Sequence, residues 1–154
     1  MKVGSPIEVK AKSLLIFQEK NVAIILLEDT GGKWGLPILA KASEVASIHL
    51  TLSGRKSQRP LSHDLMASII QTLKVRVLHV LVDILEEPLC HGIVALEVQG
   101  REMDFDSRPS DAIALALRAR VPIYVSAELV GKGAIYYDRD DWFSDLEGKA
   151  KLEN

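Results

Sequence analysis

The stretch from Pro109 to Arg120 limits the possible fold more than any other part of the chain. It has the spacing of a helix, and its central residues are apolar on almost every side, from Ala112 through Leu117. A helix on a protein surface has a single apolar stripe, so a helix that is apolar nearly all round must be enclosed by other elements. We therefore expect a buried helix that ends before Pro122 and has strands and helices packed around it.

Short apolar or alternating runs predict the strands that would enclose this helix. These runs span 7–17, 22–27, 34–39, 75–85, 92–98, 103–106 and 123–125. Gly31 and Gly32 predict a hairpin turn after the second run. Pro37 places the third run at an edge or an end of the sheet, and a change of phase within 75–85 predicts a bulge.

Helical spacing of apolar residues predicts further helices over 40–52 and 62–73, and a short one over 126–130. Because the strands come in groups rather than alternating strictly with helices, the pattern favours an α+β domain. We expect a single domain with a mixed, largely antiparallel sheet packed with two to three helices. We assign residues 1–137 to this domain and 138–154 to an acidic C-terminal tail with six acidic and three basic residues.

Composition excludes several classes of protein. Hydrophobic residues make up 47% of the 154 residues and charged residues 26%, which is typical of a globular domain and excludes a disordered chain. Cys90 is the single cysteine, so no internal disulfide or multi-cysteine zinc site is expected. No apolar run approaches the ~20 residues that span a bilayer, and 1–17 lacks the uninterrupted core of a signal peptide. We expect a soluble, cytoplasmic protein, whose net charge of −2 does not by itself indicate a nucleic-acid binder.

A cluster of polar residues lies directly before the buried helix. Asp104 and Asp106 are two apart on a predicted strand and project to the same side. Asp111 lies in the first turn of the helix that follows. Carboxylates that converge there suit Mg²⁺ or Mn²⁺, which prefer oxygen ligands, and the guanidinium of Arg108 suits phosphate. The alternative is structural: Asp111 and a neighbouring serine cap the helix, and Arg108 pairs with Asp106.

A second polar cluster opens the helix predicted over 62–73. His63 lies in the first turn, where the helix dipole favours the neutral imidazole, which can accept a proton from water. Asp64 can orient His63 only if their side chains meet elsewhere, because adjacent helix positions do not face each other. The alternative is a surface histidine in a capping turn. The preceding loop carries Arg55, Lys56 and Arg59, which suit a phosphate backbone.

Both clusters carry a resemblance to a known family. The strings RPLSHDLMASIIQTL (59–73) and DFDSRPSDAIALALRARVPIYVS (104–126), with LPI (36–38) and Glu44, resemble the bifunctional nuclease domain family over about residues 7–130. The resemblance implies a single α+β domain, a homodimer or higher homo-oligomer, and activity on both DNA and RNA. The chain departs from the family where a glycine usually follows LPI, because Lys41 stands there and offers a further phosphate contact.

Together, residues and resemblance predict a nuclease that hydrolyses phosphodiester bonds of DNA and RNA, assisted by a divalent metal ion, Mg²⁺ or Mn²⁺. His63 would be the base or acid, Asp106 and Asp111 would hold the metal or a water, and Asp64 is a further catalytic candidate. The expected substrate-binding residues are Arg59, Arg108, Arg55, Lys56 and Ser110. The alternative is a non-catalytic, homo-oligomeric binding or regulatory domain, which the scarcity of aromatic residues for base stacking favours. A small-molecule hydrolase is a third option.

Overall fold

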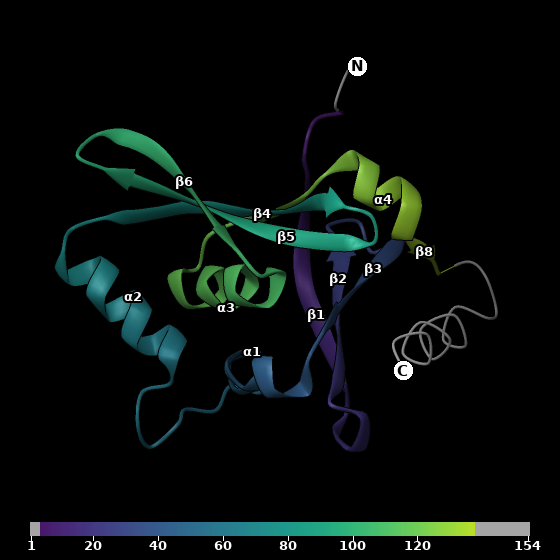
Figure 1. Ribbon diagram of the computed structural model, residues 1–154, viewed down its shortest axis with the longest axis horizontal. Coiled ribbons are helices and arrows are strands. Elements are labelled where there is room, and N and C mark those ends of the chain that lie inside the picture. Colours follow the sequence, from purple (N-terminus) through teal and green to yellow (C-terminus); the bar gives the residue numbers. More distant parts are fainter. Residues whose placement is uncertain (1–3, 138–154) are drawn as a thin grey trace.

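An eight-stranded sheet organises the chain in the computed structural model, which describes residues 4–137 (Figure 1). The strands are β1 (Ile7–Phe17), β2 (Val22–Asp29), β3 (Trp34–Ala40), β4 (Arg76–Glu86), β5 (Leu89–Val98), β6 (Arg101–Ser107), β7 (Ile123–Val125) and β8 (Ile135–Tyr136). Their order across the sheet is β6-β5-β4-β7-β1-β2-β3-β8. Neighbours are antiparallel except β4 and β7, which run parallel. The predicted α+β domain with a mixed, largely antiparallel sheet is confirmed, while the predicted tail over 138–154 lies outside the described residues.

Four α-helices accompany the sheet in this part of the chain: α1 (Ala46–Leu52), α2 (Ser62–Thr72), α3 (Pro109–Ala119) and α4 (Ala127–Gly133). Two 3₁₀ turns, η1 (Gln18–Lys20) and η2 (Ala42–Glu44), complete the set. The helix predicted over 40–52 was wrong at its start, because β3 runs on to Ala40 and η2 intervenes. The Glu44 amide bonds to the Lys41 carbonyl oxygen at 2.9 Å, and this tight turn separates the strand from α1. No helix within residues 4–137 has the length and apolarity needed to cross a membrane.

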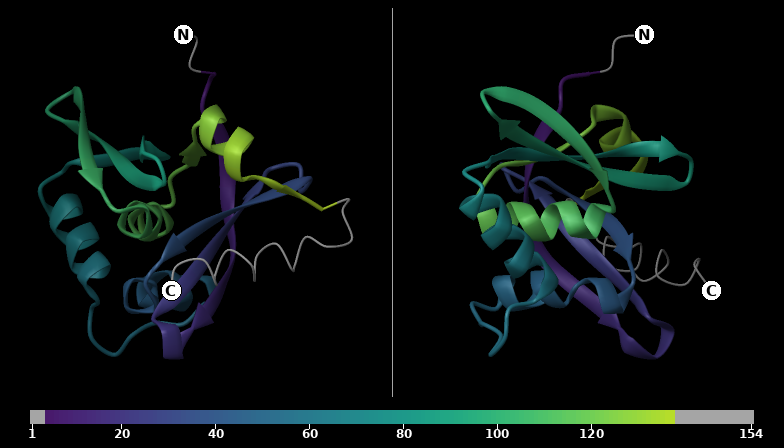
Figure 2. Two further views of the ribbon diagram at one scale, coloured as in Figure 1. Left: turned by 45° about the vertical axis from the view of Figure 1, so that its right-hand side comes forward. Right: turned by 60° about the vertical axis from the view of Figure 1, so that its left-hand side comes forward.

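Helix α3 is the buried helix that the sequence predicts. Ser110 and the run from Ala112 to Ala116 are all buried. The helix packs on β4 and β5 and also contacts α1 and α2, and it lies on the concave side of the twisted sheet (Figure 2). Its first residue follows almost directly on the last residue of β6, so the polar residues at this junction are held between the sheet and the helices.

The junction between β6 and α3 is fixed onto β5 at Gly92. The hydroxyl of Ser107 donates to the Gly92 carbonyl oxygen at 3.0 Å. A Cβ atom at Gly92 would lie 2.7 Å from Cβ of Ala112 and 2.9 Å from the carbonyl oxygen of Arg108, closer than real Cβ contacts come. A glycine is therefore required there, and the close approach determines where α3 begins.

Two local predictions hold within the sheet. Pro37 pairs with Leu26 of β2 on one side, but β8 reaches only Trp34 and Gly35 on the other, so Pro37 lies where β3 has a free edge. The change of phase in β4 is a register shift between Val77 and His79. Strand β8 was not predicted, because two residues are too short to show a periodic pattern.

Candidate functional site

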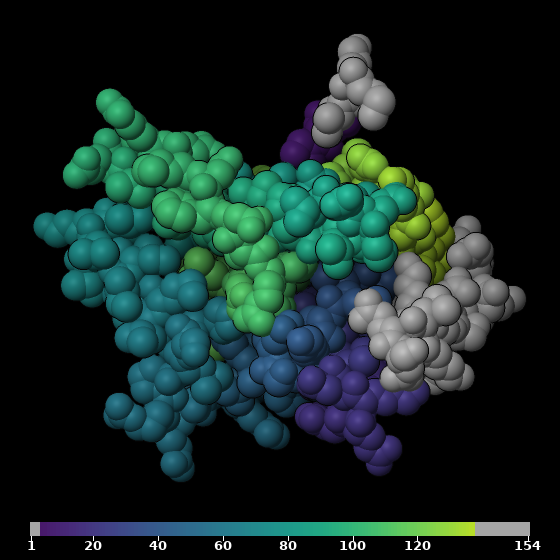
Figure 3. Space-filling model, viewed as in Figure 1, coloured from purple at the N-terminus to yellow at the C-terminus, as the bar shows by residue number. Residues whose placement is uncertain are grey.

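A hollow of about 910 Å³ opens where the end of β6, the start of α3, the first turns of α2 and the η2–α1 segment meet. Figure 3 shows these segments gathered on one face of the molecule. We call this space the main hollow. Its charged or titratable lining residues are Lys41, Glu44, His63, Asp106, Arg108 and Asp111, and its apolar ones include Met66, Val94, Leu96, Phe105 and Leu115. An apolar cavity with a few converging polar groups is the usual form of a ligand or active site.

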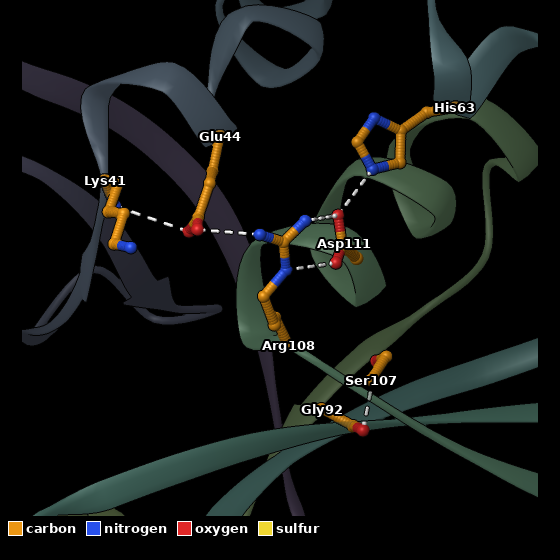
Figure 4. Close-up of polar contacts among 7 residues, drawn as sticks. All are labelled: Lys41, Glu44, His63, Gly92, Ser107, Arg108 and Asp111. Atoms are coloured by element: carbon orange, nitrogen blue, oxygen red, sulfur yellow. Dashed lines mark hydrogen bonds and ion pairs between the residues drawn. The ribbon is translucent and has the colours of Figure 1, made fainter.

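Four of these side chains form one continuous series of hydrogen bonds (Figure 4). Nε2 of His63 lies 2.9 Å from Oδ1 of Asp111. Arg108 donates from Nε to Oδ2 of Asp111 at 2.6 Å and from Nη2 to Oδ1 at 3.1 Å. Its Nη1 donates to Oε1 of Glu44 at 2.7 Å, and Oε2 of Glu44 accepts from the Lys41 backbone N–H at 3.4 Å. The series ties η2, α2 and α3 together across the main hollow.

Local helix signals place the central members of this series. Arg108 is the N-cap residue of α3, in extended conformation, and Pro109 follows at the first helical position. Asp111 lies in the first turn, where the positive end of the helix dipole favours a carboxylate. Arg108 and Asp111 are three residues apart, the spacing at which side chains on a helix end can meet. His63 occupies the equivalent first turn of α2 and reaches Asp111 from there.

The carboxyl group of Asp111 is ionised at neutral pH. Burial alone would raise its pKa, but hydrogen bonds from Arg108 and His63 outweigh that effect, so the pKa lies below its ordinary value. An ionised Asp111 can accept the Nε2 proton of His63, which fixes the orientation of the ring and leaves Nδ1 as the proton acceptor. In the described part of the chain Nδ1 of His63 has no hydrogen-bond partner. The arrangement can therefore accept a proton from a water or hydroxyl bound in the main hollow.

A buried hydroxyl adds a second polar feature to the main hollow. Ser47, on α1, lines the hollow and is only 3% exposed. Its Oγ atom has no hydrogen-bond partner. A buried polar atom left without a partner costs about 1–3 kcal/mol. The Oγ atom is covered by protein atoms, so this hydroxyl lies beneath the wall of the hollow.

Asp64 is directed away from His63 and does not line the main hollow. Its Oδ2 accepts from the Leu61 backbone N–H at 2.9 Å, which caps α2. Its Oδ1 accepts from Nε of Arg118 on α3, and Arg118 also donates to the Ser47 carbonyl oxygen at 3.4 Å. The Leu61 hydrogen bond, helped by Arg118, lowers the pKa of Asp64. Asp64 therefore joins α2 to α3, Arg118 continues the contact to α1, and a catalytic part for Asp64 stays a prediction.

Asp106 lines the main hollow, but its hydrogen bond is to a residue outside the series His63–Asp111–Arg108–Glu44. Its Oδ1 lies 2.9 Å from Nδ1 of His91 on β5, and its side chain is 79% exposed. The structural alternative that paired Arg108 with Asp106 is wrong, because Arg108 binds Asp111 and Glu44 instead.

The predicted substrate-binding residues divide into separate groups. Arg108 lies in the main hollow, whereas Arg55 and Lys56 line a different, basic hollow. Arg59, on the loop before α2, lines neither. Ser110 is 1% exposed and is not among the residues that line the main hollow.

The carboxylates predicted to hold a metal ion are engaged by other groups. Asp111 uses both oxygens for Arg108 and His63, and Asp106 is bonded to His91. Within residues 4–137, no group of three or more His, Cys, Asp or Glu side chains is placed to hold a metal ion. Mg²⁺ and Mn²⁺ require several oxygen ligands. The donor set as it lies does not fit such an ion, and metal assistance stays a prediction.

From the sequence alone, no catalytic or binding role is expected for Glu44, Ser47 or Arg118. Glu44 stands out only through the family motif, and the arginine that it binds is 64 residues away. Arg118 is 54 residues from Asp64, so no local spacing indicates their contact. Ser47 offers one weak signal, a polar residue among the apolar positions of a short helix.

Comparison with known proteins agrees with this geometry. The family model of the bifunctional nuclease domain matches residues 24–138, a range that contains both polar clusters and the whole main hollow. Two uncharacterized proteins of Mycobacterium tuberculosis, from the CDC 1551 and H37Rv strains, are each 34% identical over 135 residues. The alignment covers 87% of this chain and 80% of each relative. The polar motifs build this hollow, and the family model matches most of the chain. The chain therefore belongs to the bifunctional nuclease domain family.

Proposed function

We propose that this protein is a nuclease that hydrolyses phosphodiester bonds of DNA and RNA in the main hollow. The observation that carries the proposal is the hydrogen-bonded series from His63 through Asp111 and Arg108 to Glu44. Membership in the bifunctional nuclease domain family supports nucleic acid as the partner.

Hydrolysis of a phosphodiester needs an activated water and stabilisation of the phosphoryl oxygens. Nδ1 of His63 would take a proton from the attacking water while Asp111 holds the ring through Nε2. The water oxygen bonds to phosphorus, the bond from phosphorus to the leaving sugar oxygen breaks, and that oxygen takes a proton from solvent. His63 therefore acts as the general base of the proposed reaction.

Arg108 and Lys41 suit the charge that develops on the phosphate. The Arg108 guanidinium has five N–H donors, and three are engaged by Asp111 and Glu44. Its side chain is 59% exposed, so the remaining donors are open to a phosphoryl oxygen. Lys41 lines the same hollow and adds positive charge.

No step of this mechanism uses a metal ion. Assistance by Mg²⁺ or Mn²⁺ through Asp106 and Asp111 stays a prediction that metal addition and chelation can test.

The proposal includes a homodimer or higher homo-oligomer. Leu65 and Ile69 on α2 and Leu73 at its C-cap recur every four residues and are 57%, 50% and 68% exposed. An exposed apolar row on one helix face supports contact with a second copy of the chain. A cytoplasmic location also belongs to the proposal, and the single thiol of Cys90 suits a reducing compartment.

A non-catalytic binding or regulatory domain is the second candidate. The observation that favours it is that Glu44, Asp64 and Asp111 all have cationic partners, as in a purely structural network.

The deciding experiment measures cleavage of end-labelled single-stranded DNA and RNA by purified protein with Mg²⁺, Mn²⁺ or EDTA. Asp111→Asn keeps the shape of the side chain but removes its charge, so it should lower cleavage at least ~100-fold without unfolding the protein. Asp104→Asn, prepared identically, removes an exposed carboxylate outside the main hollow and should cleave like the wild type.

Each outcome of the assay has a definite meaning. Loss of cleavage in a folded Asp111→Asn protein supports the nuclease. Cleavage that survives in Asp111→Asn would point to a contaminant or to another site. No cleavage in any sample, with or without metal, would favour the non-catalytic domain.

A further inference from the structure

A second hollow, of about 580 Å³, borders the first turn of α2 as the main hollow does. It is formed by the loop between α1 and α2, by α2 and by the C-terminal end of α3. Its charged lining residues are Arg55, Lys56, Asp64, Arg118 and Arg120. We call it the basic hollow.

The basic hollow concentrates positive charge in a chain whose net charge is −2. Four cationic lining residues face a single carboxylate, so the lining carries a formal charge of +3. Asp64 is committed to Arg118 and to the Leu61 backbone. In the part of the chain that the structure describes, Arg55, Lys56 and Arg120 have no carboxylate within ion-pair distance. Their charge is available to an anion that enters the hollow.

Backbone geometry holds two of these cations in place. The Arg55 N–H donates to the Leu50 carbonyl oxygen at 2.9 Å, directly after Gly54 turns the chain with φ of 66°. Arg120 is the C-cap of α3 with φ of 57°, and its N–H bonds to the Ala116 carbonyl oxygen. Both side chains therefore start from fixed points at the ends of two helices that pack on each other.

The two hollows are joined through the start of α2. His63 lines the main hollow and its neighbour Asp64 lines the basic hollow. Arg118 lines the basic hollow and donates to the carbonyl oxygen of Ser47, which lines the main hollow. A nucleic-acid strand with a phosphate beside His63 has further phosphates on either side, and the basic hollow is the adjacent positive surface.

The lining of the basic hollow also limits what it can recognise. It contains no aromatic side chain on which a base could stack. Guanidinium and ammonium groups bind phosphate regardless of the base attached to it. The hollow is therefore suited to the sugar-phosphate backbone and not to base sequence.

We propose that the basic hollow binds the phosphate backbone of the strand whose scissile bond lies in the main hollow, through Arg55, Lys56 and Arg120. This inference rests on the proposed function and adds to it a backbone-binding surface that does not read sequence.

The test separates binding from cleavage. Binding of a fluorescent 12-mer oligothymidylate and of a 12-mer of abasic phosphodiester units is measured by anisotropy, in the Asp111→Asn protein, at several salt concentrations. Arg55→Gln/Arg120→Gln is compared with Lys20→Gln/Arg101→Gln, which removes the same charge outside both hollows. Circular dichroism checks that both variants are folded.

Each lost phosphate contact on a single strand lowers the slope of log K against log salt by about 0.7. We expect the Arg55→Gln/Arg120→Gln protein to lose about 1.4 in slope and about 10- to 30-fold in affinity at 0.1 M salt. The loss should be the same for both probes within about twofold, while the control double variant stays within about threefold of its parent. The single Lys56→Gln change should give about half the loss in slope.

The outcomes distinguish this inference from the proposed function. If the protein never cleaves but shows the expected loss of affinity and slope, the basic hollow is supported as a backbone-binding surface and the nuclease proposal is rejected. If the protein cleaves but the slope of log K against log salt is unchanged in Arg55→Gln/Arg120→Gln, the proposed role of the basic hollow is rejected and the nuclease proposal stands. A loss seen only with oligothymidylate would mean that bases, and not phosphates, are read there, which also overturns it.

Discussion

Nε2 of His63 lies 2.9 Å from Oδ1 of Asp111, although 48 residues separate them in the sequence. This contact joins the first turn of α2 to the first turn of α3 and makes one site of two polar clusters. Capping alone does not account for it, because a cap bonds to the backbone of its own helix. Arg108 extends the contact to Glu44, so an ionised carboxylate, an imidazole and a guanidinium share one hollow.

Replacing His63 with glutamine tests the general base directly. Glutamine can still donate a hydrogen bond to Asp111 but cannot accept a proton at neutral pH. We expect kcat on single-stranded oligonucleotides to fall by about 10²–10⁴-fold, the usual contribution of a positioned base. The matched control is His79→Gln on β4, whose ring packs on Tyr124 outside the main hollow. A His63→Gln rate within threefold of the control would remove His63 from the mechanism.

Arg108→Lys tests whether the positive charge at this position is sufficient or whether the planar guanidinium of Arg108 is also needed. Lysine keeps the positive charge but cannot hold Asp111 in a two-point contact and also reach Glu44. We expect kcat/KM to fall about 10- to 100-fold and the free energy of unfolding to fall by about 1 kcal/mol, because Arg108 is 59% exposed and solvent screens its ion pairs. The control is Arg76→Lys, which alters a two-point pair with Glu97 on the exposed surface. That pair is exposed and screened by solvent, so the change should have little effect on stability and leave cleavage unaltered. Equal losses in the two variants would argue against a special role for Arg108.

The elements that sequence predicts best are those whose pattern is local. The run from Ala112 to Leu117 is apolar on all sides, and α3 is buried as expected. Strand β8 has two residues, and a pattern that short cannot be told from a loop. The helix over 40–52 was predicted too long because its apolar spacing continues through Ala42, while the turn at η2 depends on hydrogen bonds that spacing does not reveal.

For the candidate site, residue types were predictable and partners were not. The density of polar residues around Arg108 and in the first turn of α2 pointed to two segments, and both segments reach the main hollow. The choice between His63 and Asp64 as the partner of Asp111 depends on how α2 packs against α3. Arg118, near the C-terminal end of α3, donates a hydrogen bond to Asp64. Contacts between residues so far apart in the sequence depend on how the helices pack, and this packing cannot be predicted from the local pattern of a single sequence.

Gly92→Ala should disturb the site by crowding the junction between β6 and α3. The added methyl group would meet Ala112, Ser107 and the Arg108 carbonyl oxygen, so α3 or β5 must shift. We expect a loss of about 1–3 kcal/mol in the free energy of unfolding and a fall in cleavage from misplacement of Arg108 and Asp111. The control is Gly131→Ala in α4, where nothing lies within 4 Å and alanine favours the helix. A Gly92→Ala protein as stable as the wild type would show that the junction is looser than its distances indicate.

The exposed row on α2 predicts the state of assembly. Ile69→Glu places a charge in the middle of this row, and a charge that becomes buried against a second copy is strongly unfavourable. We expect the mass measured by light scattering to fall from an oligomer to a monomer, with the unfolding temperature of the domain changed little because Ile69 is half exposed. Leu85→Glu, at a position that is 61% exposed on β4, is the control and should leave the mass unchanged. An oligomer that persists in Ile69→Glu would locate the contact elsewhere.

Asp64→Asn should reveal a pH-dependent contribution to stability. The pKa of Asp64 in the folded protein lies below its ordinary value, mainly through the Leu61 hydrogen bond. A carboxyl whose folded pKa is depressed stabilises the fold above its unfolded pKa, and this stabilisation is lost as pH falls through the folded pKa. At pH 7 we expect Asp64→Asn to lower the free energy of unfolding by about 1–3 kcal/mol. As the pH falls below about 4 and through the folded pKa, the wild type loses the same contribution, so urea titrations of the two proteins should converge. Asp104→Asn, an exposed carboxylate with no ion pair in the described structure, should stay within about 0.5 kcal/mol of the wild type throughout. A difference between wild type and Asp64→Asn that stays constant from pH 7 to acid would assign the loss to packing, and not to the charge held between Leu61 and Arg118.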